Sequence, residues 1–86
     1  IIYWSKYIWM NVFLENGITC LDLHGERHPD VKDVVIDFTY RYQDKLPLRI
    51  ICGNSQRMIN LAEESLISHS ITFSSPRFGI IRIEKI

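Results

Sequence analysis

The sequence carries no excess charge of either sign. Ten lysine and arginine residues balance ten aspartate and glutamate residues over the 86-residue chain, so the formal net charge is zero. Proteins that bind nucleic acid without specificity depend on many phosphate contacts and are usually basic. Any binding of a phosphate chain by this protein must therefore depend on a local arrangement of cationic groups.

Cysteine is scarce, and long apolar runs are absent. The two cysteines, Cys20 and Cys52, are far apart, whereas small secreted domains usually carry several closely spaced cysteines that form disulfides. No apolar segment approaches the length of a membrane span, and no Asn-x-Ser/Thr glycosylation sequence occurs. We therefore expect a cytoplasmic protein with reduced thiols and no membrane partner.

Hydrophobic residues make up 47% of the chain and charged residues 23%, and this composition and length are typical of one small folded domain. Residues 1–17 stand apart as an N-terminal arm rich in aromatic side chains, and the domain comprises residues 18–86. The aromatic residues of the arm are Tyr3, Trp4, Tyr7, Trp9 and Phe13. The arm either covers an exposed face of the sheet or forms a homodimer contact, and the sequence does not decide between these alternatives.

Apolar residues alternate, or recur at helical spacing, in six successive segments. These are a strand over 18–23, a helix from His28-Pro29 to Tyr42, a strand over 48–52, a helix ending near His69, and strands over 71–74 and 80–86. A strand–helix–strand unit requires parallel strands with a right-handed crossover, whereas the final hairpin requires an antiparallel pair. The order β-α-β-α-β-β predicts an α/β fold, more closely an α+β two-layer sandwich. Its two helices cover one face of a four-stranded mixed sheet.

The stretch Leu21-Asp22-Leu23-His24-Gly25 ends the first predicted strand. Asp22 and His24 share one face at its carboxyl end, where ligands bind in open α/β sheets. Because an imidazole transfers protons near neutral pH, the sequence predicts a catalytic pair: Asp22 orients His24, which acts as a general acid or base. In the alternative, Asp22 accepts backbone N–H groups of a turn and His24 only ends the strand.

Two strand-to-helix turns, at residues 25–28 and 53–55, are expected at the same edge of the sheet because the first two strands are parallel. Unpaired N–H groups and the helix dipole suit helix N-termini to phosphate. Arginine side chains at the same edge can bind phosphate oxygens in pairs. The predicted nucleic-acid-binding residues are Gly25, Arg27, Gly53, Asn54, Ser55, Arg57 and Arg77.

Acidic and imidazole side chains cluster after the first strand, which raises the alternative of a divalent cation. Carboxylates hold Mg²⁺ or Mn²⁺ in many enzymes that hydrolyse phosphodiesters. The residues concerned are Asp22, His24, Glu26, His28 and Asp30. A solvated charged loop explains the same cluster, so Mg²⁺ or Mn²⁺ stays an alternative and no residue is assigned as a metal ligand.

Cys52 precedes the second predicted helix, and a thiol at a helix N-terminus can have a lowered pKa and act as a nucleophile. A phosphatase loop resembles Cys-x5-Arg, whereas only four residues separate Cys52 from Arg57. We therefore expect Cys52 to be a small buried apolar residue.

The stretch Leu21–Gly25, followed by an amphipathic helix and then by Ile50-Ile51-Cys52-Gly53 before a second helix, resembles the Smr (small MutS-related) domain family. The resemblance extends over roughly residues 18–86. It implies binding of DNA or RNA with endonuclease or nicking activity. It also implies a fold similar to the C-terminal domain of bacterial translation initiation factor three, with strand order 1-2-4-3 and the fourth strand antiparallel.

The second half of the family pattern is altered. Smr domains typically carry His-Gly-x-Gly after the second strand, where this chain has Cys52-Gly53-Asn54-Ser55. The family's Leu-Arg pair falls on Ile59-Asn60, and Arg57, on the same helix face, is the candidate replacement for that arginine. Two hypotheses follow: a nuclease centred on Asp22 and His24, or a non-catalytic module that binds nucleic acid or protein after losing its second motif.

Overall fold

The computed structural model of the chain describes residues 10–86 and contains five strands and two α-helices. The strands are β1 (Asn11–Glu15), β2 (Ile18–Asp22), β3 (Leu48–Ile51), β4 (Thr72–Arg77) and β5 (Ile80–Lys85). The helices are α1 (His28–Arg41) and α2 (Gln56–Ser68), with a short 3₁₀ helix, η1 (Gln43–Lys45), between α1 and β3. Both α-helices and four of the strands lie within three residues of the predicted positions.

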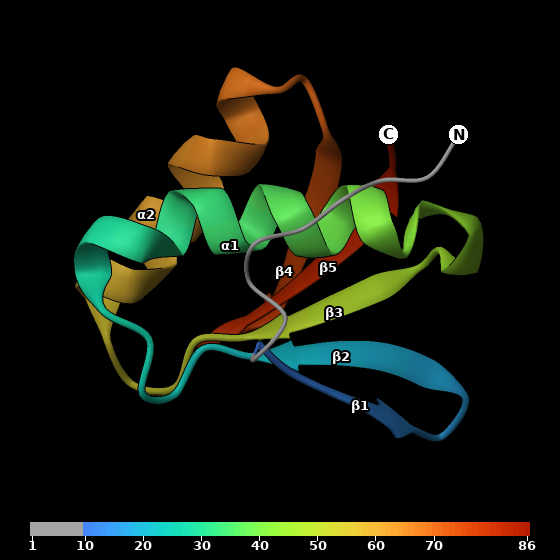
Figure 1. Ribbon diagram of the computed structural model, residues 1–86, viewed down its shortest axis with the longest axis horizontal. Coiled ribbons are helices and arrows are strands. Elements are labelled where there is room, and N and C mark those ends of the chain that lie inside the picture. Colours follow the sequence, from blue (N-terminus) through green and yellow to red (C-terminus); the bar gives the residue numbers. More distant parts are fainter. Residues whose placement is uncertain (1–9) are drawn as a thin grey trace.

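The strands form one mixed sheet in the order β1-β2-β3-β5-β4. Strands β2 and β3 are parallel, and the other three neighbouring pairs are antiparallel. Both helices lie on the same side of this sheet, and within residues 10–86 no helix covers the opposite side, which we call the open face (Figure 1). The α+β two-layer architecture is therefore as predicted, and the four predicted strands follow one another in the predicted order.

The sheet has five strands and not four, because part of the predicted arm belongs to it. Strand β1 pairs with β2 through a turn at Asn16 and Gly17, which both have positive φ (52° and 80°). Asn-Gly is a strong signal for a two-residue hairpin turn. This hairpin was not predicted, because the many aromatic side chains of residues 1–17 indicated a separate arm. Met10 is buried in the core. The predictions for Tyr3, Trp4 and the other residues of 1–9 lie outside the described residues.

The core lies between the sheet and the two helices. Alternation along each strand places one set of apolar side chains under the helices, and a single stripe of each helix faces them. The fully buried members include Leu21, Leu23, Val31, Val34, Val35, Phe38, Leu48, Ile50, Leu66, Ile81 and Ile83. Within residues 10–86, neither helix has the length and apolar character needed to cross a bilayer.

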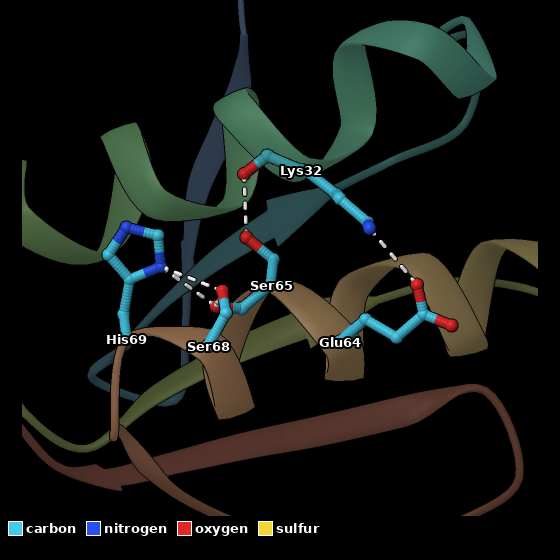
Figure 2. Close-up of polar contacts among 5 residues, drawn as sticks. All are labelled: Lys32, Glu64, Ser65, Ser68 and His69. Carbon is cyan, nitrogen blue, oxygen red and sulfur yellow. Dashed lines mark hydrogen bonds and ion pairs between the residues drawn. The ribbon is translucent and has the colours of Figure 1, made fainter.

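A polar contact links the two helices across their buried interface (Figure 2). The Ser65 hydroxyl of α2 donates to the backbone carbonyl of Lys32 in α1 at 2.8 Å, and Ser65 is 2% exposed. Lys32 and Glu64 form an exposed ion pair beside it at 3.1 Å. At the end of α2, the ring nitrogen Nδ1 of His69 lies 3.0 Å from the Ser65 carbonyl. The small serine therefore allows close approach of the helices and contributes a hydrogen bond.

Replacing Ser65 by alanine should lower the free energy of unfolding by about 1 kcal/mol, because the buried hydrogen bond to Lys32 is lost. Ser68→Ala is the matched control, since the Ser68 hydroxyl is exposed and bonds only within its own helix end. That variant should change stability by less than about 0.5 kcal/mol. Urea unfolding followed by circular dichroism measures both. Equal losses would show that the contact between the helices contributes nothing.

Candidate functional site

Three tight turns meet at one edge of the sheet, which we call the loop edge (residues 23–27, 52–55 and 78–79). In the first, the Glu26 amide donates to the Leu23 carbonyl at 3.0 Å, and Gly25 has a φ of 85°. The β4–β5 turn is bonded to the second, because the Cys52 amide donates to the Gly79 carbonyl at 2.7 Å. The β2–α1 and β3–α2 connections lie side by side, as expected for two parallel neighbouring strands (Figure 1).

Asp22 and His24 form a side-chain pair at the loop edge. One oxygen of Asp22, Oδ1, accepts the backbone N–H of His24 at 2.9 Å and lies 3.2 Å from Nδ1 of its ring. The His24 side chain is 76% exposed and that of Asp22 only 24%. An added Cβ on Gly53 would lie 3.2 Å from the His24 ring, so the ring rests against this glycine. Asp22 thus engages Nδ1, which leaves Nε2 as the ring nitrogen available to a ligand.

Gly53 and Gly79 approach each other too closely for a side chain to fit. Gly79 has a φ of 84°, and a Cβ added there would collide with the carbonyl oxygen of Gly53. Left-handed backbone of this kind favours glycine. The β4–β5 turn is therefore held against the β3–α2 connection, directly beside the residue on which the His24 ring rests.

Arg57 and His28 join the first turns of the two helices. The Arg57 side chain donates from Nε to Nδ1 of His28 at 3.0 Å. Ser55 is the N-cap of α2, and its hydroxyl accepts the Met58 amide at 3.1 Å, so one helix N–H is already satisfied. Arg27 is the N-cap of α1, makes no side-chain cap and is exposed. The N-termini of both helices therefore open at the loop edge.

The predicted phosphate-binding arginines do not form one cluster. Arg57 is engaged with His28, whereas Arg77 lines a pocket on the open face of the sheet together with Arg49 and Arg82. Sequence reasoning missed Arg49 and Arg82. The signal for them was the alternation of side chains along β3 and β5, because it places both arginines on the face of the sheet that points away from the core.

Exposed residues complete the loop edge. Asn54, one of the predicted nucleic-acid-binding residues, is exposed in the β3–α2 connection. Phe78, at the tip of the β4–β5 turn, is 62% exposed and was not predicted as a site residue. A large aromatic side chain at a turn tip is the signal that could have indicated it.

The acidic and imidazole residues after β2 do not gather into a ligand set for a metal. Within the described part of the chain, no group of three or more His, Cys, Asp or Glu side chains is placed to hold a metal ion. Burial raises the pKa of Glu26, and the nearby Asp30 carboxylate raises it further. The residues present do not fit a resident divalent cation, so no step below is assigned to one.

Cys52 is a buried thiol and not a nucleophile. Burial raises its pKa to about 12, and the Glu63 carboxylate adds to the effect. Burial also raises the pKa of Cys20, the other free cysteine. Only the thiolate is nucleophilic, so Cys52 fills space at the end of β3, as expected from the sequence.

A Cys20→Ala variant isolates the Cys52 thiol for a direct test. At pH 8 only about one Cys52 side chain in 10⁴ is a thiolate when its pKa is near 12. Iodoacetamide should therefore modify the folded protein slowly and the urea-unfolded protein rapidly, as measured by mass spectrometry over time. Rapid modification of the folded variant, with no effect of urea, would contradict the burial of Cys52.

Gly79→Ala should lower the free energy of unfolding by about 3 kcal/mol or more, since it combines left-handed backbone with a collision against Gly53. Gly17→Ala is the control, because Gly17 has a similar φ of 80° but open space around it. That variant should cost about 1 kcal/mol. Urea unfolding of both variants separates the collision from the backbone strain, and equal costs would contradict the close approach.

Comparisons with family models, curated proteins and solved structures find no match to this chain. The resemblance to the Smr family, and the similarity to the C-terminal domain of translation initiation factor three, therefore remain predictions from the sequence. The geometry of the loop edge alone supports the proposal below.

Proposed function

We propose that this domain binds nucleic acid at the loop edge and hydrolyses phosphodiester bonds there, with His24 as the general acid and base and Asp22 as its orienting carboxylate. The observation that carries the proposal is the 3.2 Å contact between Asp22 Oδ1 and His24 Nδ1 on a side chain that is 76% exposed. An oriented imidazole that faces solvent is suited to proton transfer with a large substrate.

The reaction assigned to this pair is attack of water on phosphorus. Nε2 of His24 accepts the proton of the attacking water as the new P–O bond forms and the bond to the leaving sugar oxygen breaks. The imidazolium then gives this proton to the leaving oxygen. Asp22, bonded to Nδ1, holds the ring in one tautomer and stabilises the imidazolium between the two transfers.

The surroundings of the pair suit the charge of a phosphodiester. The first turns of α1 and α2 both begin at the loop edge, and their N–H groups and dipoles favour an anion. Arg57, held by His28 between these turns, adds a guanidinium group. Gly25 has open space where a side chain would stand, so a phosphate can approach the backbone there, whereas the space beside Gly53 is occupied by the His24 ring.

A non-catalytic module is the second candidate, and Cys52 favours it. The end of β3 carries a buried thiol with a pKa of about 12 where the Smr pattern has a histidine. Such a thiol gives no proton near neutral pH, so it cannot share the work of His24. If His24 alone does not support cleavage, the same loop edge binds nucleic acid without cutting it.

The test measures cleavage and binding separately, with labelled single-stranded and hairpin DNA and RNA, in EDTA and in Mg²⁺ or Mn²⁺. His24→Ala should lower the cleavage rate by about 10²–10⁴-fold, and Asp22→Asn should also lower it, while binding is retained. His69→Ala is the matched control, because His69 caps the far end of α2, about 20 Å along the helix axis. It should cleave at the parent rate.

Each outcome decides between the candidates. Cleavage that survives His24→Ala would overturn the assignment of His24. Binding without cleavage under every condition would establish the non-catalytic module. Absence of both binding and cleavage would overturn the proposed function altogether.

A further inference from the structure

The open face of the sheet carries a pocket of about 350 Å³ between β3, β5 and β4. Cationic side chains form its walls and two isoleucines form its floor. The residues that line it include Glu15, Arg49, Ile51, Arg77, Ile80 and Arg82. None of these side chains belongs to the Asp22–His24 pair.

The sheet register brings the three arginines together. Arg49 of β3 lies opposite Arg82 of β5, and Arg77 of β4 lies opposite Ile80 of β5. The register of β4 shifts between Ser74 and Arg77, next to Pro76 in the pocket wall. Three neighbouring strands, whose order in the sheet is β3-β5-β4, thus each contribute one guanidinium group to the pocket.

This pocket is locally basic although the chain as a whole is neutral. Three arginines face one lining carboxylate, Glu15, which pairs with Arg49 at 2.7 Å. Arg82 pairs with Glu84 at 3.4 Å, and the four side chains of these two pairs are 28–54% exposed. Exposed pairs contribute little to stability and can exchange with another anion. The Arg77 side chain has no hydrogen bond or ion pair within the described part of the chain.

The pocket is continuous with the catalytic pair across the sheet. Asp22, Ile51, Ile80 and Arg77 are successive neighbours in one transverse row of four adjacent strands. Strands lie about 4.8 Å apart, so Asp22 and Arg77 are separated by about 14 Å. A single nucleic-acid strand of a few nucleotides covers such a distance.

We infer that the open face of the sheet is the path of a single-stranded nucleic acid, whose phosphates are bound by Arg77, Arg49 and Arg82 beside the Asp22–His24 pair. This inference rests on the proposed nucleic-acid function and defines its substrate as single-stranded. Guanidinium groups match phosphate oxygens in geometry and charge. Ile51 and Ile80 offer an apolar floor to unpaired bases.

Phe78 supports a single strand over a duplex. It is 62% exposed, follows Arg77 directly in the β4–β5 turn, and lines a second hollow against α2 that shares Arg77 and Ile80 with the basic pocket. Exposed aromatic rings beside a basic groove stack on unpaired bases in proteins that bind single strands. In a duplex the bases are already stacked, so neither this ring nor the apolar floor would find a partner.

The test uses fluorescence anisotropy with labelled single strands of uridylate or thymidylate of about 12 nucleotides, over a salt series. Arg77→Gln should weaken binding by about 3- to 10-fold and reduce the slope of log affinity against log salt by about 0.7. The triple variant Arg49→Gln, Arg77→Gln, Arg82→Gln should lose most of the slope. Glu15→Gln, which releases Arg49, should bind more tightly than the parent.

Lys32→Gln is the matched control, because it removes the same charge from the helix layer on the other side of the sheet. It should bind like the parent, and thermal unfolding of every variant checks the fold. If the parent binds and the triple variant binds equally well, the open-face path is overturned while the function at the loop edge stands. Equal competition by a duplex would overturn the single-stranded substrate. If the parent binds neither probe, the proposed function fails first.

Discussion

The contact between Gly53 and Gly79 is the constraint on which the site depends. The Cys52 amide donates to the Gly79 carbonyl, and no side chain fits between the two glycines. This contact fixes the β4–β5 turn against the β3–α2 connection, and the His24 ring rests on the same Gly53. One backbone junction thereby sets the positions of the imidazole, of the N-terminus of α2 and of the strand end that carries Arg77.

Local patterns in the sequence were sufficient to predict most of the fold and part of the site. Alternation and helical spacing located both helices and four strands, and the Asp22–His24 pair followed from its place at a strand end. The hairpin at Asn16-Gly17 was not predicted, because the aromatic side chains before it indicated a separate arm, although Asn-Gly is a strong hairpin-turn signal. Alternation places Arg49 and Arg82 on the same face, but their meeting in one pocket depends on β5 lying between β3 and β4, an order that the Smr resemblance implied and local pattern did not.

A net charge of zero conceals an uneven distribution of charge. On the open face three arginines meet one carboxylate in a single pocket. On the helix layer, Lys32 pairs with Glu64, so charges there compensate one another. Because interactions with a phosphate act over roughly a Debye length of 8–10 Å, a ligand responds to the pocket and not to the whole chain. Composition alone therefore underestimates the affinity of such a domain for an anion.

The proposed general acid and base and the arginines of the open face belong to separate parts of this molecule. The imidazole belongs to the β2–α1 connection, whereas the arginines project from β3, β4 and β5. Cys52, at the position where the Smr pattern has a histidine, packs as a small buried apolar residue at the end of β3 and offers no proton donor near neutral pH. Under the proposed function, a change at the end of β3 would therefore alter the rate of cleavage and leave the arginines of the open face in place.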